Sequence, residues 1–145
     1  GEVAQHANQL HLQLRDVVDE RRPDLIFAPS PIDHHHDHTA TAKAALRLFD
    51  ELRSFRLAFY EVYSTIRFTH LIDITDVAER KKDVIRTYRT SLYGRPETYI
   101  HATLGLNAQR SLFVEQGTYF EAFWIVDRSL DSAAVINWLT YGFSS

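Results

Sequence analysis

A short apolar run that ends in a polar loop, with an amphipathic helix directly after it, most restricts the fold of this chain. Residues 24–29 read Asp-Leu-Ile-Phe-Ala-Pro, without the polar alternation of a half-exposed strand. Such a run is typical of a strand covered on both faces, as in a parallel sheet. After the loop at residues 30–37, apolar residues recur at helical spacing: Ala42, Ala45, Leu46, Phe49 and Leu52. The segment therefore predicts a strand, loop and helix of the α/β class.

Strands and helices alternate along the rest of the chain. An apolar stripe at Val3, Ala7, Leu10, Leu14 and Val17 predicts a first helix, which Pro23 ends. The pattern also predicts strands at 57–63, 71–74 and 119–126, and helices at 97–115 and 131–141. A further helix begins at Thr75 or Asp76 and has as its predicted inward face Val77, Val84, Ile85, Tyr88 and Leu92. We expect one α/β domain over residues 1–145, with a mostly parallel sheet.

Composition excludes several classes of function. The chain has no Cys, so a transition metal has to be held by His and carboxylate side chains. The formal net charge of −3, with Lys and Arg spread along the chain, argues against nucleic acid as a partner. No apolar run approaches the roughly 20 residues of a membrane span, and no signal peptide is evident. We therefore expect a soluble, cytoplasmic protein.

Half of the chain's eight histidines lie within five positions, in the segment Asp33-His-His-His-Asp-His38. Imidazole and carboxylate suit Zn²⁺ and similar ions, and ligands of open α/β sheets bind at the carboxyl ends of strands. A purification tag would normally lie at a terminus and would not be flanked by a strand and an amphipathic helix. A solvated loop has no need for four imidazoles, so metal or acid–base chemistry is favoured. The remaining histidines, which form no second motif, are His6, His11, His70 and His101. Since a zinc hydrolase needs about three protein ligands, the loop predicts half of a site.

The loop resembles the second metal motif of the PIG-L (LmbE-like) deacetylases, His-Pro-Asp-His followed by an alanine-bearing helix. The matching residues are Phe27-Ala-Pro-Ser-Pro, the cluster from Asp33 to His38, and Thr39-Ala40. Further blocks in the family's order are Phe59–Val62, Leu71–Thr75 with Lys81 and Lys82, Tyr88, Asn107, Arg110 and Tyr119–Phe123. They cover about two-thirds of the chain and are most similar to the bacterial branch. The resemblance implies a Rossmann-like three-layer α/β/α fold.

The resemblance also implies roles for single residues. His38 matches the metal-binding histidine, and His35 matches the histidine that stabilises charge or donates a proton. Asp37 matches the motif aspartate, for which an orienting role toward imidazole is physically reasonable. His36 stands where the family has proline, which leaves His34 and His36 as alternative ligands. Thr90-Ser91 replaces the family's Ser-Gln.

The family's other motif, Ala-His-Pro-Asp-Asp-Glu, does not occur in this chain. It is implied to supply the remaining metal ligands and the general-base aspartate. We therefore expect an N-terminal βαβ portion upstream of Gly1, and a fragment that is inactive alone and that either associates with that portion or self-associates. For the intact protein, the resemblance implies Zn²⁺-dependent removal of the N-acetyl group from a GlcNAc-type conjugate.

Two other functions stay open at this point. The loop could belong to a non-enzymatic metal-binding or assembly module, or to a hydrolase of another class such as a phosphoesterase. Arg110 and Glu121 carry charge among apolar neighbours. We expect them to support the fold rather than to bind substrate.

Overall fold

The structure, a computed structural model, describes residues 2–88 and 92–142, so Thr90 and Ser91 lie outside the described residues. The chain forms two compact units. The first comprises residues 1–70 and 123–145, and the second comprises residues 71–122. Compact units do not by themselves decide how many domains a chain has, so the single domain over residues 1–145 stays a prediction.

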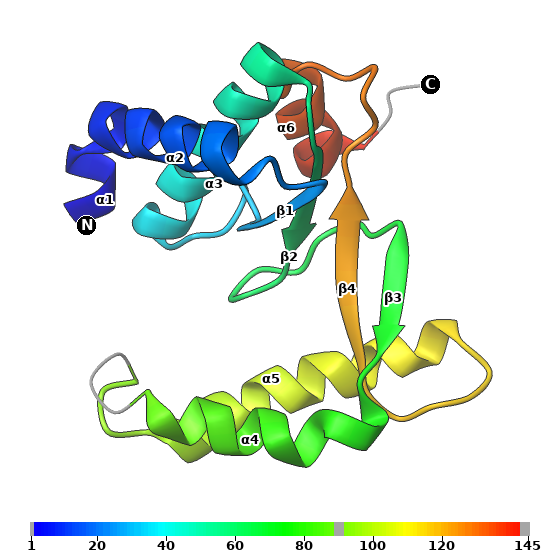
Figure 1. Ribbon diagram of the computed structural model, residues 1–145. Coiled ribbons are helices and arrows are strands. Elements are labelled where there is room, and N and C mark those ends of the chain that lie inside the picture. Colours follow the sequence, from blue (N-terminus) through cyan, green and yellow to red (C-terminus); the bar gives the residue numbers. More distant parts are fainter. Residues whose placement is uncertain (1, 89–91, 143–145) are drawn as a thin grey trace. The chain divides into compact units, whose positions relative to one another are not determined.

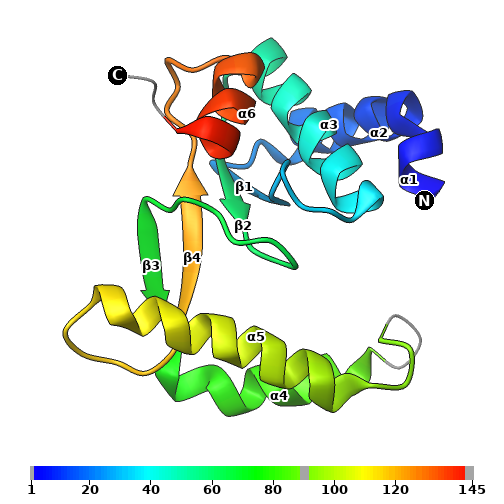
Figure 2. The ribbon, with the colours of Figure 1, turned by 180° about the vertical axis from the view of Figure 1, so that it is seen from behind.

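The first unit is organised around one central helix, α3. Its elements are α1 (Glu2–Gln5), α2 (Ala7–Arg21), β1 (Leu25–Pro29), α3 (His36–Leu52), β2 (Arg56–Tyr60), the end of β4 (Phe120–Ile125) and α6 (Ser132–Tyr141). Helix α3 contacts α2, α6, β1 and β2, and it runs between α2 and α6 in Figures 1 and 2. The predicted helix at Ala42–Leu52 is thus confirmed, and it begins earlier than its apolar stripe, at His36 within the histidine cluster.

Large apolar side chains from α3 and β2 form the core of the first unit. Phe49, Phe55 and Phe59 are fully buried, as are Leu46, Leu48 and Leu57. The rings of Trp124 and Trp138 stack with their centroids 4.4 Å apart, which joins β4 to α6. Burial of one such side chain contributes roughly 1.5–3 kcal/mol relative to exposure. The core therefore fixes the position of α3 and of the loop that leads into it.

The sheet is mixed, in the order β1-β2-β4-β3, where β3 is His70–Asp73. Strands β1 and β2 are parallel, with Leu25 opposite Arg56, whereas β2 and β4 are antiparallel. Helices packed with strands confirm the α/β class. The three-layer Rossmann-like arrangement and the mostly parallel sheet stay predictions.

The second unit consists of two helices beside paired strand segments. It contains η1 (Thr75–Val77), α4 (Ala78–Thr87), α5 (Pro96–Arg110), η2 (Ser111–Phe113), most of β3 and the start of β4. Its small core joins Ala78 of α4 to Ile100 and Leu104 of α5. Lys81 Nζ donates to Asn107 Oδ1 at 2.8 Å and to Glu121 Oε1 at 2.6 Å, and Asn107 Nδ2 donates to the Phe120 carbonyl at 2.9 Å. This network supports the structural role expected of Glu121, which is partly exposed, whereas Arg110 is buried.

Three expectations about buried faces are wrong. Val17 is 53% exposed, and α2 buries His11 and Val18 instead. Val77, Val84 and Tyr88 of the predicted inward face are about half exposed. Ile85 packs on the core of that unit, and Leu92, which lies beyond the end of α4, is buried as predicted. Phe27 is 55% exposed and meets the edge of Phe123, so β1 is not covered on both faces by the described residues.

Within the described ranges 2–88 and 92–142, none of the helices combines the length and the apolar character that crossing a bilayer requires.

Replacing Asn107 by Ala should lower the free energy of unfolding by about 1–3 kcal/mol, because it removes a buried side chain that accepts from Lys81 and donates to β4. Urea denaturation followed by circular dichroism measures the change. Asn8 on α2 is exposed and serves as the control, since Asn8→Ala should change stability by less than about 0.5 kcal/mol. Equal stability of the two variants would contradict the role given to Asn107.

Candidate metal and catalytic site in the histidine loop

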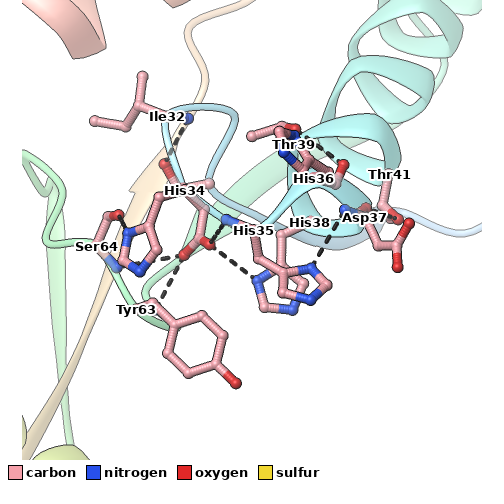
Figure 3. A network of polar contacts seen from close by, with 12 residues as sticks. Ile32, His34, His35, His36, Asp37, His38, Thr39, Thr41, Tyr63 and Ser64 are labelled. Carbon is pink, nitrogen blue, oxygen red and sulfur yellow. Dashed lines mark hydrogen bonds and ion pairs between the residues drawn. The ribbon is translucent and has the colours of Figure 1, made fainter. Parts of the chain in front are cut away.

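Two loops meet at the carboxyl ends of β1 and β2. Because these strands are parallel and in register from Leu25 to Pro29, their carboxyl ends lie at the same edge of the sheet. The Ser30 amide continues the pairing by donating to the Tyr60 carbonyl at 3.1 Å. The loop at residues 30–35 then leads into α3, and the loop after β2 runs beside it. Figure 3 shows the polar contacts between them.

The buried carboxylate of Asp33 joins the two loops. Its Oδ1 accepts from the His35 amide at 2.9 Å and lies 3.1 Å from His38 Nδ1. Its Oδ2 accepts from the amides of Tyr63 at 3.0 Å and Ser64 at 3.3 Å. The side chain has no exposed surface, so these donors replace water around the charge. Asp33 is therefore the central residue of the site, and the sequence reasoning gave it no role.

The hydrogen bonds keep Asp33 ionised. Burial by itself would raise the pKa of this carboxyl, but the amides of His35 and Tyr63 and the ring of His38 outweigh that cost. The pKa of Asp33 is consequently held below its ordinary value of 3.8. The carboxylate is available near neutral pH as an acceptor of hydrogen bonds.

His38 lies in the first turn of α3 and is held on two sides. Its Nδ1 contacts Asp33, and its ring stacks on Tyr63 with centroids 5.4 Å apart and an interplanar angle of 20°. The side chain keeps 26% of its surface exposed. An imidazole that bonds a carboxylate through one nitrogen, and keeps the other for a further partner, has the arrangement typical of a metal ligand. His38 therefore suits the role predicted for it.

His35 lies next to His38 and begins the helix. It is the N-cap residue of α3, and its Nδ1 accepts from the Asp37 amide at 3.3 Å. The rings of His35 and His38 have centroids 4.6 Å apart. The structure thus brings together the two histidines that the resemblance singles out, as Figure 3 shows.

The carboxylate that contacts Nδ1 of His38 is that of Asp33. Asp37 contributes its backbone amide to the N-cap, and its carbonyl accepts from Thr41 Oγ1 at 2.8 Å. Its acidic side chain stands in the first turn of α3, where negative charge is favourable. The orienting role predicted for Asp37 stays a prediction.

His34 and His36, the two alternative ligands, have different neighbours from His38. His34 Nδ1 lies 3.0 Å from Ser64 Oγ, and its ring centroid is 5.7 Å from that of Tyr63. His36 is exposed and lines a groove that α3 forms with α1 and α2, together with His11 and Lys43. The imidazole that packs against the ring of His38 is that of His35.

A zinc site needs more ligands than this loop supplies. Within residues 2–88 and 92–142, no group of three or more His, Cys, Asp or Glu residues is placed to hold a metal ion. A hydrolytic zinc ion typically takes three protein ligands and one open position. Among the described residues, His38 is suited to be one of these ligands, and the carboxylate of Asp33 contacts its Nδ1. The half-site that the loop's sequence predicts therefore stays a prediction.

Several solved structures are similar to this chain. The conserved protein TT1542 from Thermus thermophilus matches with a TM-score of 0.66 and 23% identity, over 80% of this chain and 57% of that chain. The zinc-inhibited form of the teicoplanin deacetylase Orf2 matches with a TM-score of 0.63 and 20% identity, over 90% and 55%. The A40926 pseudoaglycone deacetylase Dbv21 matches with a TM-score of 0.66 and 21% identity, over 89% and 60%.

No family model and no curated protein matches the chain. The likeness to solved structures is below 25% identity and shows the fold alone. The chain shares its fold with part of these proteins, two of which are named as deacetylases, and it spans less than two-thirds of their length.

Asp33→Asn should lower the free energy of unfolding at pH 7 by about 1–3 kcal/mol. In the wild type, backbone amides donate to both carboxylate oxygens of Asp33, and the NH₂ group that replaces one oxygen in the variant cannot accept a hydrogen bond. Urea denaturation gives the value. Asp16→Asn, an exposed change on α2, is the matched control and should have no measurable effect.

The loss of unfolding free energy in Asp33→Asn should also depend on pH. Because the folded-state pKa of Asp33 is lowered, its stabilisation is present above the ordinary value of 3.8 and is lost as the pH falls through the folded pKa. The difference between wild type and variant should therefore shrink below pH 3.8. A difference that stays the same through strongly acidic pH would contradict the ionised state.

Proposed function

We propose that this chain carries one half of the active site of a zinc-dependent deacetylase, which removes the N-acetyl group from a GlcNAc-type conjugate. The observation that carries the proposal is the pair of imidazoles at the carboxyl ends of β1 and β2, with a buried carboxylate behind His38. Its support is threefold: the geometry of the pair, the resemblance of the loop to the PIG-L (LmbE-like) motif, and a fold shared with proteins named as deacetylases.

In this proposal, His38 and His35 have different roles. His38 would hold Zn²⁺ through Nε2, since its Nδ1 is occupied by Asp33. When bound, the ion would act as a Lewis acid toward the acetyl carbonyl and would make water a better nucleophile. His35, whose ring lies 4.6 Å from that of His38, would donate a hydrogen bond to the negative charge on the carbonyl oxygen.

The reaction needs proton transfer as well as charge stabilisation. Addition of water to the acetyl carbon and rupture of the C–N bond yield acetate and an amine, and the departing nitrogen must gain a proton. The proton that a general base takes from water would be returned to this nitrogen, which balances the step, while the Nε2–H group of His35 would donate a hydrogen bond to the carbonyl oxygen. Asp37 would orient the ring of His35, because its backbone amide donates to His35 Nδ1 at the start of α3. The base that accepts the proton from water is expected from the upstream motif that this chain lacks.

The proposal requires a contribution from outside the chain. This chain spans 55–60% of the two named deacetylases that it matches, and its described residues supply one suitable ligand. Strand β1 is at the edge of the described sheet, and its Phe27 is 55% exposed. A neighbouring strand that covers this edge could bring the remaining ligands toward the carboxyl end of β1.

Substitutions in the intact protein should separate the roles of three of the four histidines in the cluster. His38→Ala should lower both the bound zinc and the rate of acetate release, because it removes a ligand. His35→Ala should keep the zinc and lower kcat, since a group that acts on developing charge is not needed to hold the ion in the ground state. His34→Ala should leave both near wild type.

The measurements are zinc content by atomic emission and acetate release from an N-acetylglucosamine conjugate. Other divalent ions should be compared with Zn²⁺, because one neighbour is named in a zinc-inhibited form. Equal loss of zinc from His34→Ala and His38→Ala would contradict the ligand assignment. Zinc binding without acetate release in the wild type would favour the metal-binding module instead.

Activity should appear only when both halves of the site are present. The 145-residue chain alone should release no acetate, and a mixture with the segment carrying the His-Pro-Asp-Asp motif should release it, because one ligand cannot hold zinc in a hydrolytic site. His38→Ala in the same mixture is the control. Full activity of the isolated chain would show that it builds a complete site.

A further inference from the structure

The two adjacent imidazoles of the site have partners of opposite character. His38 Nδ1 lies 3.1 Å from a carboxylate oxygen of Asp33, which can only accept when the group is ionised. His35 Nδ1 lies 3.3 Å from the backbone amide of Asp37, which can only donate. A neutral imidazole carries its single proton on one nitrogen and leaves the other bare. The partner of Nδ1 therefore decides what Nε2 presents.

We propose that the fold holds His35 and His38 in opposite tautomers, and that Asp33 is the positioning residue that sets the tautomer of His38. The carboxylate requires a proton on Nδ1 of His38, so that Nε2 of this ring is bare. The helix amide requires a bare Nδ1 on His35, so that Nε2 of this ring carries the proton. Two chemically identical side chains, with ring centroids 4.6 Å apart, thus present a lone pair and an N–H group.

The partners of the two rings are themselves fixed. Asp33 is fully buried and accepts from three backbone amides besides contacting His38, so its oxygens have little freedom to turn. The Asp37 amide is one of the first amides of α3, which have no partner inside the helix. It therefore needs an acceptor from the N-cap residue, and the bare Nδ1 of His35 meets that need.

The meaning of this arrangement for catalysis rests on the proposed function. A bare Nε2 can coordinate a metal ion, whereas an Nε2–H can donate to a carbonyl oxygen that gains negative charge. The tautomers would keep His35 from competing as a ligand and would give each ring its separate role. Their existence in the free protein, however, does not depend on metal binding or on the reaction.

Nitrogen NMR of the metal-free full protein with ¹⁵N-labelled histidine tests the proposal at a pH where the rings are neutral. Long-range couplings distinguish protonated from bare ring nitrogens, and His35→Gln and His38→Gln assign the signals by their disappearance. We expect a protonated Nδ1 on His38 and a protonated Nε2 on His35. The same tautomer on both rings, or the reverse pair, would overturn the proposal, whether or not the protein proves to be a deacetylase.

Asp33→Asn tests the positioning role, with Asp16→Asn as the matched control. The variant should increase the fraction of His38 with a protonated Nε2, and it should weaken Zn²⁺ binding in the full protein about 10- to 100-fold. The control should change neither quantity. A lower melting temperature with an unchanged His38 tautomer would show that Asp33 is only structural. Should the variant fail to fold, the wild-type spectrum alone still decides between the tautomers.

Discussion

The hydrogen bonds to one buried carboxylate hold the candidate site together. Asp33 accepts from the His35 amide in its own loop and from the amides of Tyr63 and Ser64 in the loop after β2. Its cost of burial is offset because the backbone donors solvate the charge. The loops therefore cannot move independently, and the imidazole of His38 is held by both. These hydrogen bonds thereby hold the side chains of the candidate site in defined positions.

Helix α3 connects this surface to the hydrophobic core. Its first turn carries His38, and about two and three turns later Leu46 and Phe49 are almost completely buried among α2, α6 and the strands. Because the helix is continuous from His36 to Leu52, core packing determines how the first turn is oriented. The precision of the site is thus supplied by apolar contacts far from the polar residues that would react.

Local sequence patterns predicted the elements well but not the contacts between them. The strand at 25–29 and the helix after the histidine cluster follow from apolar periodicity, which is a property of neighbouring residues. The role of Asp33 could not be predicted in this way, since Tyr63 lies 30 residues away and only the parallel pairing of β1 with β2 brings it close. Apolar spacing likewise predicted an apolar stripe on the helices at 7–21 and 78–87. It did not determine which face of each helix a neighbouring element covers. Val17 and Val84 consequently proved half exposed.

The unbroken run of α3 from the histidines into the core also constrains how such a chain can change during evolution. Each residue inserted between His38 and Ala42 would rotate the first turn by about 100° relative to the buried face and lengthen the helix by about 1.5 Å. His38 would then leave the carboxylate of Asp33 and the ring of Tyr63. Exchange of the partly exposed side chains at 39–41 would leave this geometry in place, whereas insertion or deletion would not, so divergence here should conserve length more strictly than identity.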